Sequence, residues 1–162
     1  RAVVTGMRGY PSYPAVVGRL IDRAEDRVWV MLFVMHPEAD GAGPVHELVA
    51  RLGRARARGV DVRVVLDIGR EWGTDTIDDK HEAALALLAR HDVPAMVDDL
   101  ERTTHSKIVL VDDDHLVIGS HNWTRSALQR NREVSIHHRD TQLTARIAPL
   151  FTAVEGFRDL GR

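Results

Sequence analysis

The stretch THSKIVLVDDDHLVIGSHNWT, residues 104–124, decides how this sequence is interpreted. Two apolar runs flank the acidic triplet at 112–114, and this arrangement is typical of two strands joined by a tight turn. A two-residue turn at Asp113 and Asp114 gives the simplest hairpin, although it lacks the preferred Asn-Gly pair. We therefore predict a β-hairpin whose strands lie in the core.

The polar residues of this hairpin are expected to meet on one face. Side chains alternate along a strand, so His105 and Lys107 point the same way. With the turn at 113–114, residue 107 pairs with 120 and residue 105 with 122, and directly opposed residues share a face. Gly119 leaves room for a close approach. The patch predicted in this way contains His105, Lys107, Ser120 and Asn122.

These residue types suit a phosphate group. Lysine supplies a compact positive charge, and serine and asparagine supply neutral donors for the non-bridging oxygens. Histidine acts as a nucleophile or as a general acid and base near neutral pH. The combination favours phosphoryl transfer without a metal ion. Three consecutive aspartates on a turn cannot all face one ion, so residues 112–114 favour a solvated turn over a metal site.

The rest of the chain alternates helices and strands. Periodicity predicts helices at 14–26, 45–59, 76–92 and 141–160, the last kinked at Pro149, and strands at 27–35, 60–68, 93–99 and 132–138. Pro94 pushes the strand at 93–99 toward a sheet edge. This order predicts an α/β fold, a three-layer α/β/α sandwich with a mixed β-sheet, as one domain over residues 1–162.

Composition narrows the functional classes. The chain has 162 residues, 28% of them charged, and a net charge of −2, so any site for a polyanion must be local. It has no cysteine, which excludes disulfides and thiolate chemistry but leaves the compartment open. No apolar run approaches the roughly 18 residues that span a bilayer. Because residue 1 is Arg, we expect a processed or excised piece of a longer protein.

The motif residues resemble those of the phospholipase D superfamily, in which His-x-Lys, four residues, Asp and then Gly-Ser-x-Asn follow one another. The matching residues here are His105, Lys107, Asp112, Gly119, Ser120 and Asn122. The segment GSHNWTRSALQRNREVSI, residues 119–136, is similar to that of small single-motif members, which include bacterial endonucleases and mitochondrial phospholipase D-like nucleases. In those proteins a Glu on the next strand holds the catalytic His, and Glu133 stands at that place.

The resemblance implies a mechanism without cofactor or metal. His105 would attack phosphorus to form a phosphohistidine, and a second His would protonate the leaving oxygen and then activate water. Because this chain carries one motif, we expect a two-fold homodimer with a shared site. The two identical histidines then differ in protonation as a coupled pair. Glu133 would fix the tautomer of the His.

Other residues receive supporting roles. Strand parity turns Asp112 away from His105, so among the catalytic motif residues we expect it to support the hairpin and the active-site backbone, for instance through a salt bridge. Trp123 is expected in the core. Three cations after the motif could follow a phosphate backbone, namely Arg125, Arg130 and Arg132. The histidines outside the motif are expected at the surface or an interface: His36, His46, His81, His91, His137 and His138.

Three functions remain open at this point. The first is a metal-independent phosphodiesterase, a nuclease acting on DNA or RNA. The second applies the same chemistry to a phospholipid such as cardiolipin, and should show an exposed apolar surface near the site. The third is a nucleic-acid-binding module of this fold that lacks turnover.

Overall fold

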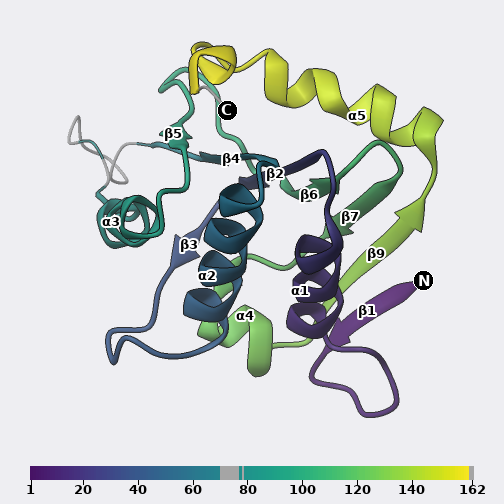
Figure 1. The fold of residues 1–162 in the computed structure, drawn as a ribbon. Coiled ribbons are helices and arrows are strands. Elements are labelled where there is room, and N and C mark those ends of the chain that lie inside the picture. The colour runs from purple at the N-terminus through teal and green to yellow at the C-terminus, as the bar shows by residue number, and fades with distance from the viewer. Residues whose placement is uncertain (70–76, 78, 161–162) are drawn as a thin grey trace.

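A computed structural model describes residues 1–69, 77 and 79–160. The strands are β1 (Ala2–Thr5), β2 (Arg27–Leu32), β3 (Met35–His36), β4 (Asp61–Leu66), β5 (Ala95–Val97), β6 (Lys107–Val111), β7 (His115–Gly119), β8 (Trp123–Thr124) and β9 (Glu133–Arg139). The helices are α1 (Tyr13–Arg23), α2 (Pro44–Ala57), α3 (Glu82–Arg90), α4 (Arg125–Gln129), α5 (Thr141–Thr152) and the 3₁₀ helix η1 (Phe157–Leu160). Figure 1 shows their arrangement.

The described residues form one seven-stranded mixed sheet in the order β1-β9-β7-β6-β2-β4-β5. Strands β2, β4 and β5 run parallel, and β1, β9, β7 and β6 join them through antiparallel pairs. Strand β5 follows Pro94 and occupies one edge, which confirms the predicted edge position. Strand β1 occupies the other edge and was not predicted from the sequence.

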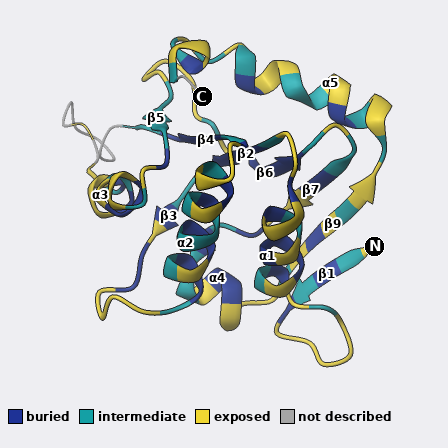
Figure 2. Ribbon diagram, in the orientation of Figure 1, coloured by how far each residue is buried: buried dark blue, intermediate teal, exposed yellow. Residues whose placement is uncertain are grey.

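Helices cover both faces of the sheet, which confirms the three-layer α/β/α arrangement (Figure 1). On one face, α1, α2 and α3 bury their apolar stripes against the strands, with Ile21, Leu52 and Leu88 fully enclosed. On the other face, Phe151 of α5 and Phe157 of η1 pack around Trp29. Figure 2 shows the sheet enclosed between these layers, and burial of this apolar surface is the main stabilising contribution to the fold.

The hairpin is present, but its predicted register is wrong by one residue. Val111 pairs with His115, so the turn contains three residues and not two. Asp112 is accommodated in the turn with a φ of 51°, a left-handed conformation that Asp tolerates better than most residues. Extending the pairing by one step places Lys107 opposite Gly119. Residue 120 therefore does not pair with Lys107.

Several boundaries also differ from the predictions. The strand expected at 27–35 divides into β2 and the short β3, because the backbone bends after Leu32. The helix expected at 141–160 ends at Thr152, and η1 follows. Pro149 lies inside the last turn of α5. Helix α4 was not predicted, and α3 begins only at Glu82. The first part of the helix predicted at 76–92 lies partly outside the described residues.

Candidate active site

The motif residues gather at one end of the sheet. Lys107 begins β6 and pairs with Leu32, the last residue of β2. Ser120 follows the end of β7, and Glu133 begins β9. The parallel strands β2 and β4 present their carboxyl ends here, where α/β proteins commonly bind ligands. The side chains described below meet here because β6 begins, β7 ends and β9 begins at this end of the sheet.

Lys107 provides a buried positive charge. Its side-chain ammonium donates to the carbonyl oxygen of His105 at 2.7 Å and lies 4.9 Å from the ring centroid of Phe33. Burial lowers the pKa of Lys107, and the nearby carboxylates of Asp67 and Glu133 oppose this effect. A cation with little water around it attracts a phosphate oxygen more strongly than a solvated one.

His105 is exposed, and its imidazole ring packs against the ring of Phe33. The ring centroids of His105 and Phe33 are 4.6 Å apart, with the planes tilted by 57°. The backbone N–H of His105 donates to the carbonyl of Thr103 at 3.2 Å, which fixes the entry to β6. The imidazole is therefore accessible to a substrate, directly beside the buried Lys107.

Ser120 and Glu133 form a hydrogen-bonded pair across β7 and β9. The Ser120 hydroxyl donates to the Glu133 carboxylate and accepts from the Val134 N–H at 3.1 Å. The other Glu133 oxygen accepts from the Asn131 amide at 3.0 Å. No hydrogen bond joins Glu133 to His105 among the described residues, so the expected contact between them stays a prediction.

The close approach of the two strands explains Gly119. A Cβ added at Gly119 would lie 2.4 Å from atoms of Ser135 and from the Val134 carbonyl oxygen, well inside normal contact distance. The sequence interpretation of this glycine as a close-approach residue agrees with the structure. Any larger residue would separate β7 from β9 and move Ser120 away from Glu133.

Asn122 reaches the same end of the sheet by a different route from the one predicted. The chain leaves β7 after Gly119, and Trp123 then joins β8 beside β3. The Asn122 side-chain oxygen accepts from the Val34 N–H at 3.1 Å. This bond orients the side chain, whose NH₂ group carries two donor hydrogens of its own. The position of Asn122 follows from the course of the chain after β7 and not from the predicted pairing of the hairpin strands.

Two charged residues of this region were missed in the sequence interpretation. Asp67 directly follows β4 and is only 1% exposed; its carboxylate accepts from the Thr104 N–H at 2.6 Å and from the Lys80 ammonium at 2.7 Å. Lys80 also lies 4.6 Å from the ring centroid of Phe33. The available signal was an acidic residue at the carboxyl end of a predicted parallel strand.

Asp112 lies at the opposite end of β6 from Lys107. Its carboxylate accepts from the backbone N–H groups of Glu25, Asp26 and Arg27 at 2.8–3.3 Å. The Arg27 side chain donates to the Asp112 carbonyl oxygen at 3.0 Å, while its ion pair goes to Asp113. Asp112 thus ties the hairpin turn to the loop before β2, as a support through backbone amides and not through the salt bridge suggested above.

The three arginines after the motif are in different environments. Arg125 pairs with Asp40 at 2.9 Å and is 37% exposed. Arg130 and Arg132 are exposed and follow α4, close in sequence to Glu133. Their contact with nucleic acid stays a prediction.

The remaining histidines are not all at the surface. His81 is 4% exposed, and its ring nitrogens lie 3.2 and 3.4 Å from the carbonyl oxygens of Phe33 and Met35, so the expected surface position is wrong. Burial lowers its pKa. His36 and His138 are exposed, whereas His46, His91 and His137 are half-buried. Among the described residues, no group of three or more His, Asp or Glu side chains could hold a metal ion.

Two residues of the motif segment, Trp123 and His121, lie in the core. Trp123 is fully buried, as predicted, and its indole N–H donates to the Tyr13 hydroxyl at 3.2 Å. His121, which the sequence interpretation did not single out, is fully buried and stacks on Tyr13 at 4.4 Å. Its ring nitrogens lie 3.0 Å from the Thr5 hydroxyl and 2.8 Å from the Ser135 hydroxyl. Burial lowers the pKa of His121 to about 4, so it is neutral at physiological pH.

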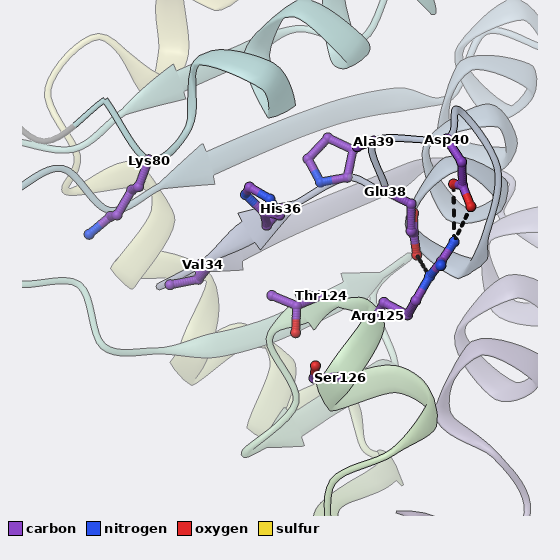
Figure 3. A pocket seen from close by; sticks show the side chains of 10 residues that line it. Val34, His36, Glu38, Ala39, Asp40, Lys80, Thr124, Arg125 and Ser126 are labelled. Atoms are coloured by element: carbon purple, nitrogen blue, oxygen red, sulfur yellow. Dashed lines mark hydrogen bonds and ion pairs between the residues drawn. The ribbon is translucent and has the colours of Figure 1, made fainter.

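An open cavity of about 730 Å³ adjoins this site, between β3, the following loop and α4. Figure 3 shows Lys80 at one end and Arg125 at the other, with His36 between them. Val34 lines the cavity and also binds Asn122 through its backbone. The cavity therefore begins directly beside the motif residues.

Comparison with known proteins agrees with this geometry. The family model described as "Cardiolipin synthase, PLD-like domain" matches residues 17–154. The chain is 28% identical over 127 residues to a Rickettsia conorii protein named phospholipase D, covering 78% of this chain and 56% of that protein. A Rickettsia bellii protein of the same name is 31% identical over 59% of this chain. The chain spans about half the length of these relatives.

Two solved structures share the fold. Nuc from Salmonella typhimurium, described as a phospholipase D family member, superposes with a TM-score of 0.73 at 22% identity and covers 100% of this chain and 96% of its own. NucT from Helicobacter pylori gives a TM-score of 0.58 at 14% identity, with 95% and 94% covered. The family match covers most of the chain, and its motif residues lie together at one end of the sheet. The chain therefore belongs to the phospholipase D-like family.

Proposed function

We propose that this protein is a metal-independent phosphodiesterase that cleaves DNA or RNA through a phosphohistidine intermediate. The observation that carries the proposal is the exposed imidazole of His105 beside the buried ammonium of Lys107. In this proposal His105 is the nucleophile and Lys107 is the cation that binds the phosphate, and Ser120 and Asn122 lie at the same end of the sheet.

The proposed reaction has two steps. A ring nitrogen of His105 forms a bond to phosphorus, and the bond from phosphorus to the leaving oxygen breaks as a second histidine donates its proton to that oxygen. Water then attacks phosphorus and gives a proton to the second histidine. As the new phosphorus–oxygen bond forms, the phosphorus–nitrogen bond breaks and His105 is released. Lys107 and the Asn122 amide stabilise the charge on the non-bridging oxygens in both steps.

The second histidine is proposed to be His105 of a second copy of this chain. A two-fold dimer would bring two exposed imidazoles to one phosphate, one acting as nucleophile and one as acid. In that arrangement Glu133, which lies near Lys107 in the same site, would orient a His105 ring. Sedimentation equilibrium tests this step: a dimer is expected, and a strict monomer with full activity would contradict it.

Nucleic acid is favoured as substrate by the exposed cations near the site. Arg132 immediately precedes Glu133 in sequence and Arg130 lies two residues earlier, and both are at the surface, where they can follow a phosphate backbone. A nucleic acid with one phosphate at the motif residues and neighbouring phosphates beside Arg130 and Arg132 would contact both the site and the exposed cations.

A phospholipid is the second candidate substrate. The specific observation is an apolar strip on β7 and β9, where Ile118, Val134 and Ile136 are 38–52% exposed close to Ser120 and Glu133. A lipid enzyme needs such a surface to reach its substrate in a membrane. The Rickettsia relatives named phospholipase D also favour this candidate. No helix among the described residues is long and apolar enough to cross a membrane.

One assay separates the candidates. The protein is incubated in excess EDTA with single-stranded DNA, duplex DNA, RNA and cardiolipin, beside a His105→Asn variant. Cleavage of a nucleic acid that persists in EDTA and disappears in the variant is expected. Hydrolysis of cardiolipin alone would support the second candidate. Binding of nucleic acid without cleavage would support a module without turnover, and loss of activity on chelation would contradict the metal-free mechanism.

A further inference from the structure

The cavity beside the motif residues has apolar walls and polar ends. Its lining includes Val34, Pro37 and Ala39, and the exposed ring of His36 stands over it (Figure 3). Its volume of about 730 Å³ lies within the range of small-molecule sites, roughly 300–1,000 Å³. A flat, mostly apolar group with polar edges fits such walls.

The charges at its ends already neutralise one another. Lys80 pairs with the buried carboxylate of Asp67, and Arg125 pairs with Asp40. Arg125 also lies 3.8 Å from an oxygen of Glu38. A second phosphate in the cavity would face the carboxylates of Glu38 and Asp40, so the lining favours a neutral ligand over an anion.

The cavity also contains an acceptor without a donor. The Glu38 side chain is 3% exposed, and its Oε2 atom has no hydrogen-bond partner within the part of the chain that the structure describes. Buried polar atoms are almost always paired, because an unpaired one loses its hydration without compensation. This Oε2 atom is closed to solvent, so Glu38 acts on a ligand in the cavity through its negative charge, which favours a ligand edge that carries N–H groups.

The cavity is within reach of a group attached to the phosphate. The Phe33 ring lies 4.6 Å from both the His105 ring and the Lys80 ammonium, and Lys80 lines the cavity. Val34, the next residue, binds Asn122 and lines the cavity as well. A substrate phosphate at His105 would therefore have its neighbouring sugar beside Phe33 and the next group in the cavity.

From these observations we infer that the cavity is a nucleobase subsite, which holds the base on one side of the scissile phosphate. The inference rests on the proposed nuclease function. The base would stack against the His36 ring and the apolar wall, and its N–H edge would face the negative charges of Glu38 and Asp40. The subsite would make cleavage depend on the presence of a base next to the bond that breaks.

The test compares substrates with and without that base. Dinucleoside monophosphates are prepared with both bases present or with an abasic sugar on either side of the phosphate, and kcat/KM is measured for each. A phosphodiester with abasic sugars on both sides serves as a substrate with no base. Two variants alter the cavity: His36→Ala removes the stacking ring, and Ser126→Tyr fills the space beside Arg125. The matched controls are His138→Ala, an exposed histidine on β9, and Ser126→Ala.

We expect the abasic sugar on one side to lower kcat/KM about tenfold in the wild-type protein, as the loss of one base-stacking contact does. Ser126→Tyr should lower kcat/KM on the base-containing substrate to the abasic level. His36→Ala should do so in part. Neither variant should change turnover of the doubly abasic phosphodiester, and the control variants should behave as wild type.

Two outcomes would overturn the inference, and they are distinguishable. Equal kcat/KM on the base-containing and abasic substrates, with turnover intact, would refute the subsite alone. A wild-type protein that hydrolyses cardiolipin but no dinucleoside monophosphate would refute the proposed nuclease function, and the subsite with it.

Discussion

Replacing Asp112 by alanine should separate the stability of this fold from its chemistry. The side chain accepts backbone N–H bonds from Glu25, Asp26 and Arg27, at 2.8 Å for the shortest. Hydrogen bonds to a charged group each contribute about 1.5–3 kcal/mol, less at the surface and less when they share one oxygen, as these do. The φ of 51° adds about 1 kcal/mol of strain for alanine. Together these give a loss of about 3 kcal/mol.

The asparagine variant is the matched control. Asn keeps an acceptor oxygen and tolerates a positive φ, so Asp112→Asn should cost only about 1 kcal/mol. A loss of about 3 kcal/mol corresponds to a Tm lower by about 6–12 °C in a domain of this size. Asp112 directly follows β6 and lies five residues after Lys107, a distance of roughly 17 Å along the strand, so kcat at 15 °C should stay within about twofold of wild type.

The measurements are thermal and urea unfolding, each followed by circular dichroism, and turnover of bis(p-nitrophenyl) phosphate on folded samples. A hundredfold loss of kcat in Asp112→Ala, with the folded state intact at the assay temperature, would refute the assignment of Asp112 as a support. A Tm unchanged in both variants would show that the three amide bonds contribute nothing to stability.

Three further predictions concern the site and its surroundings. His105→Asn should lower kcat by at least about a thousandfold while the urea midpoint stays unchanged, since the ring is exposed; residual turnover within tenfold of wild type would contradict the nucleophile. Lys107→Met should lower kcat/KM on any phosphodiester by about a hundredfold or more, because the charge on the phosphate oxygens is no longer compensated. Steady-state kinetics and the pH-rate profile measure this loss, and an effect under threefold would contradict the role of Lys107. The folded-state pKa of His121, about 4, lies below the unfolded value near 6.5, so the unfolded chain binds more protons between these values and stability falls as pH falls. Between pH 8 and pH 5 this residue should account for about 2 kcal/mol of lost unfolding free energy, and His121→Phe should remove that part of the slope; an unchanged slope would contradict the assignment.

The layered fold was predictable because its signals are local. The run at 27–35 is apolar almost throughout, which indicates a strand covered on both faces. The run at 60–68 alternates at first and then becomes continuously apolar at 64–66, and the intervening helix has one apolar stripe. Strand β1 was not predictable in the same way. Its four residues acquire strand structure by pairing with β9, more than 120 residues later, and a local pattern does not encode a distant partner.

The candidate site was predictable as a set of residues but not as a geometry. The motif placed His105, Lys107 and Ser120 together, and the structure gathers them at one end of the sheet. The register that was expected to bring them there is wrong, because Asp112 adopts a left-handed conformation and lengthens the turn by one residue.

Residues outside the motif were missed for a related reason. Phe33 and Asp67 enter the site from the ends of two parallel strands, and Lys80 reaches it from the segment before α3. Their proximity follows from the order of the strands in the sheet, which periodicity does not determine. Only the position of Asp67 at the carboxyl end of a strand marked it in advance.

The edge strand β1 has a practical consequence for anyone trimming this protein. The family match begins at residue 17, so a fragment cut at that boundary would lack β1. Its removal would leave β9 with unpaired backbone groups along an edge that carries Val134 and Ile136, a template for aggregation. It would also delete Thr5, which lies opposite Glu133 and bonds to His121. The smallest stably folded fragment should therefore retain the first strand, even though the match to the family model begins after it.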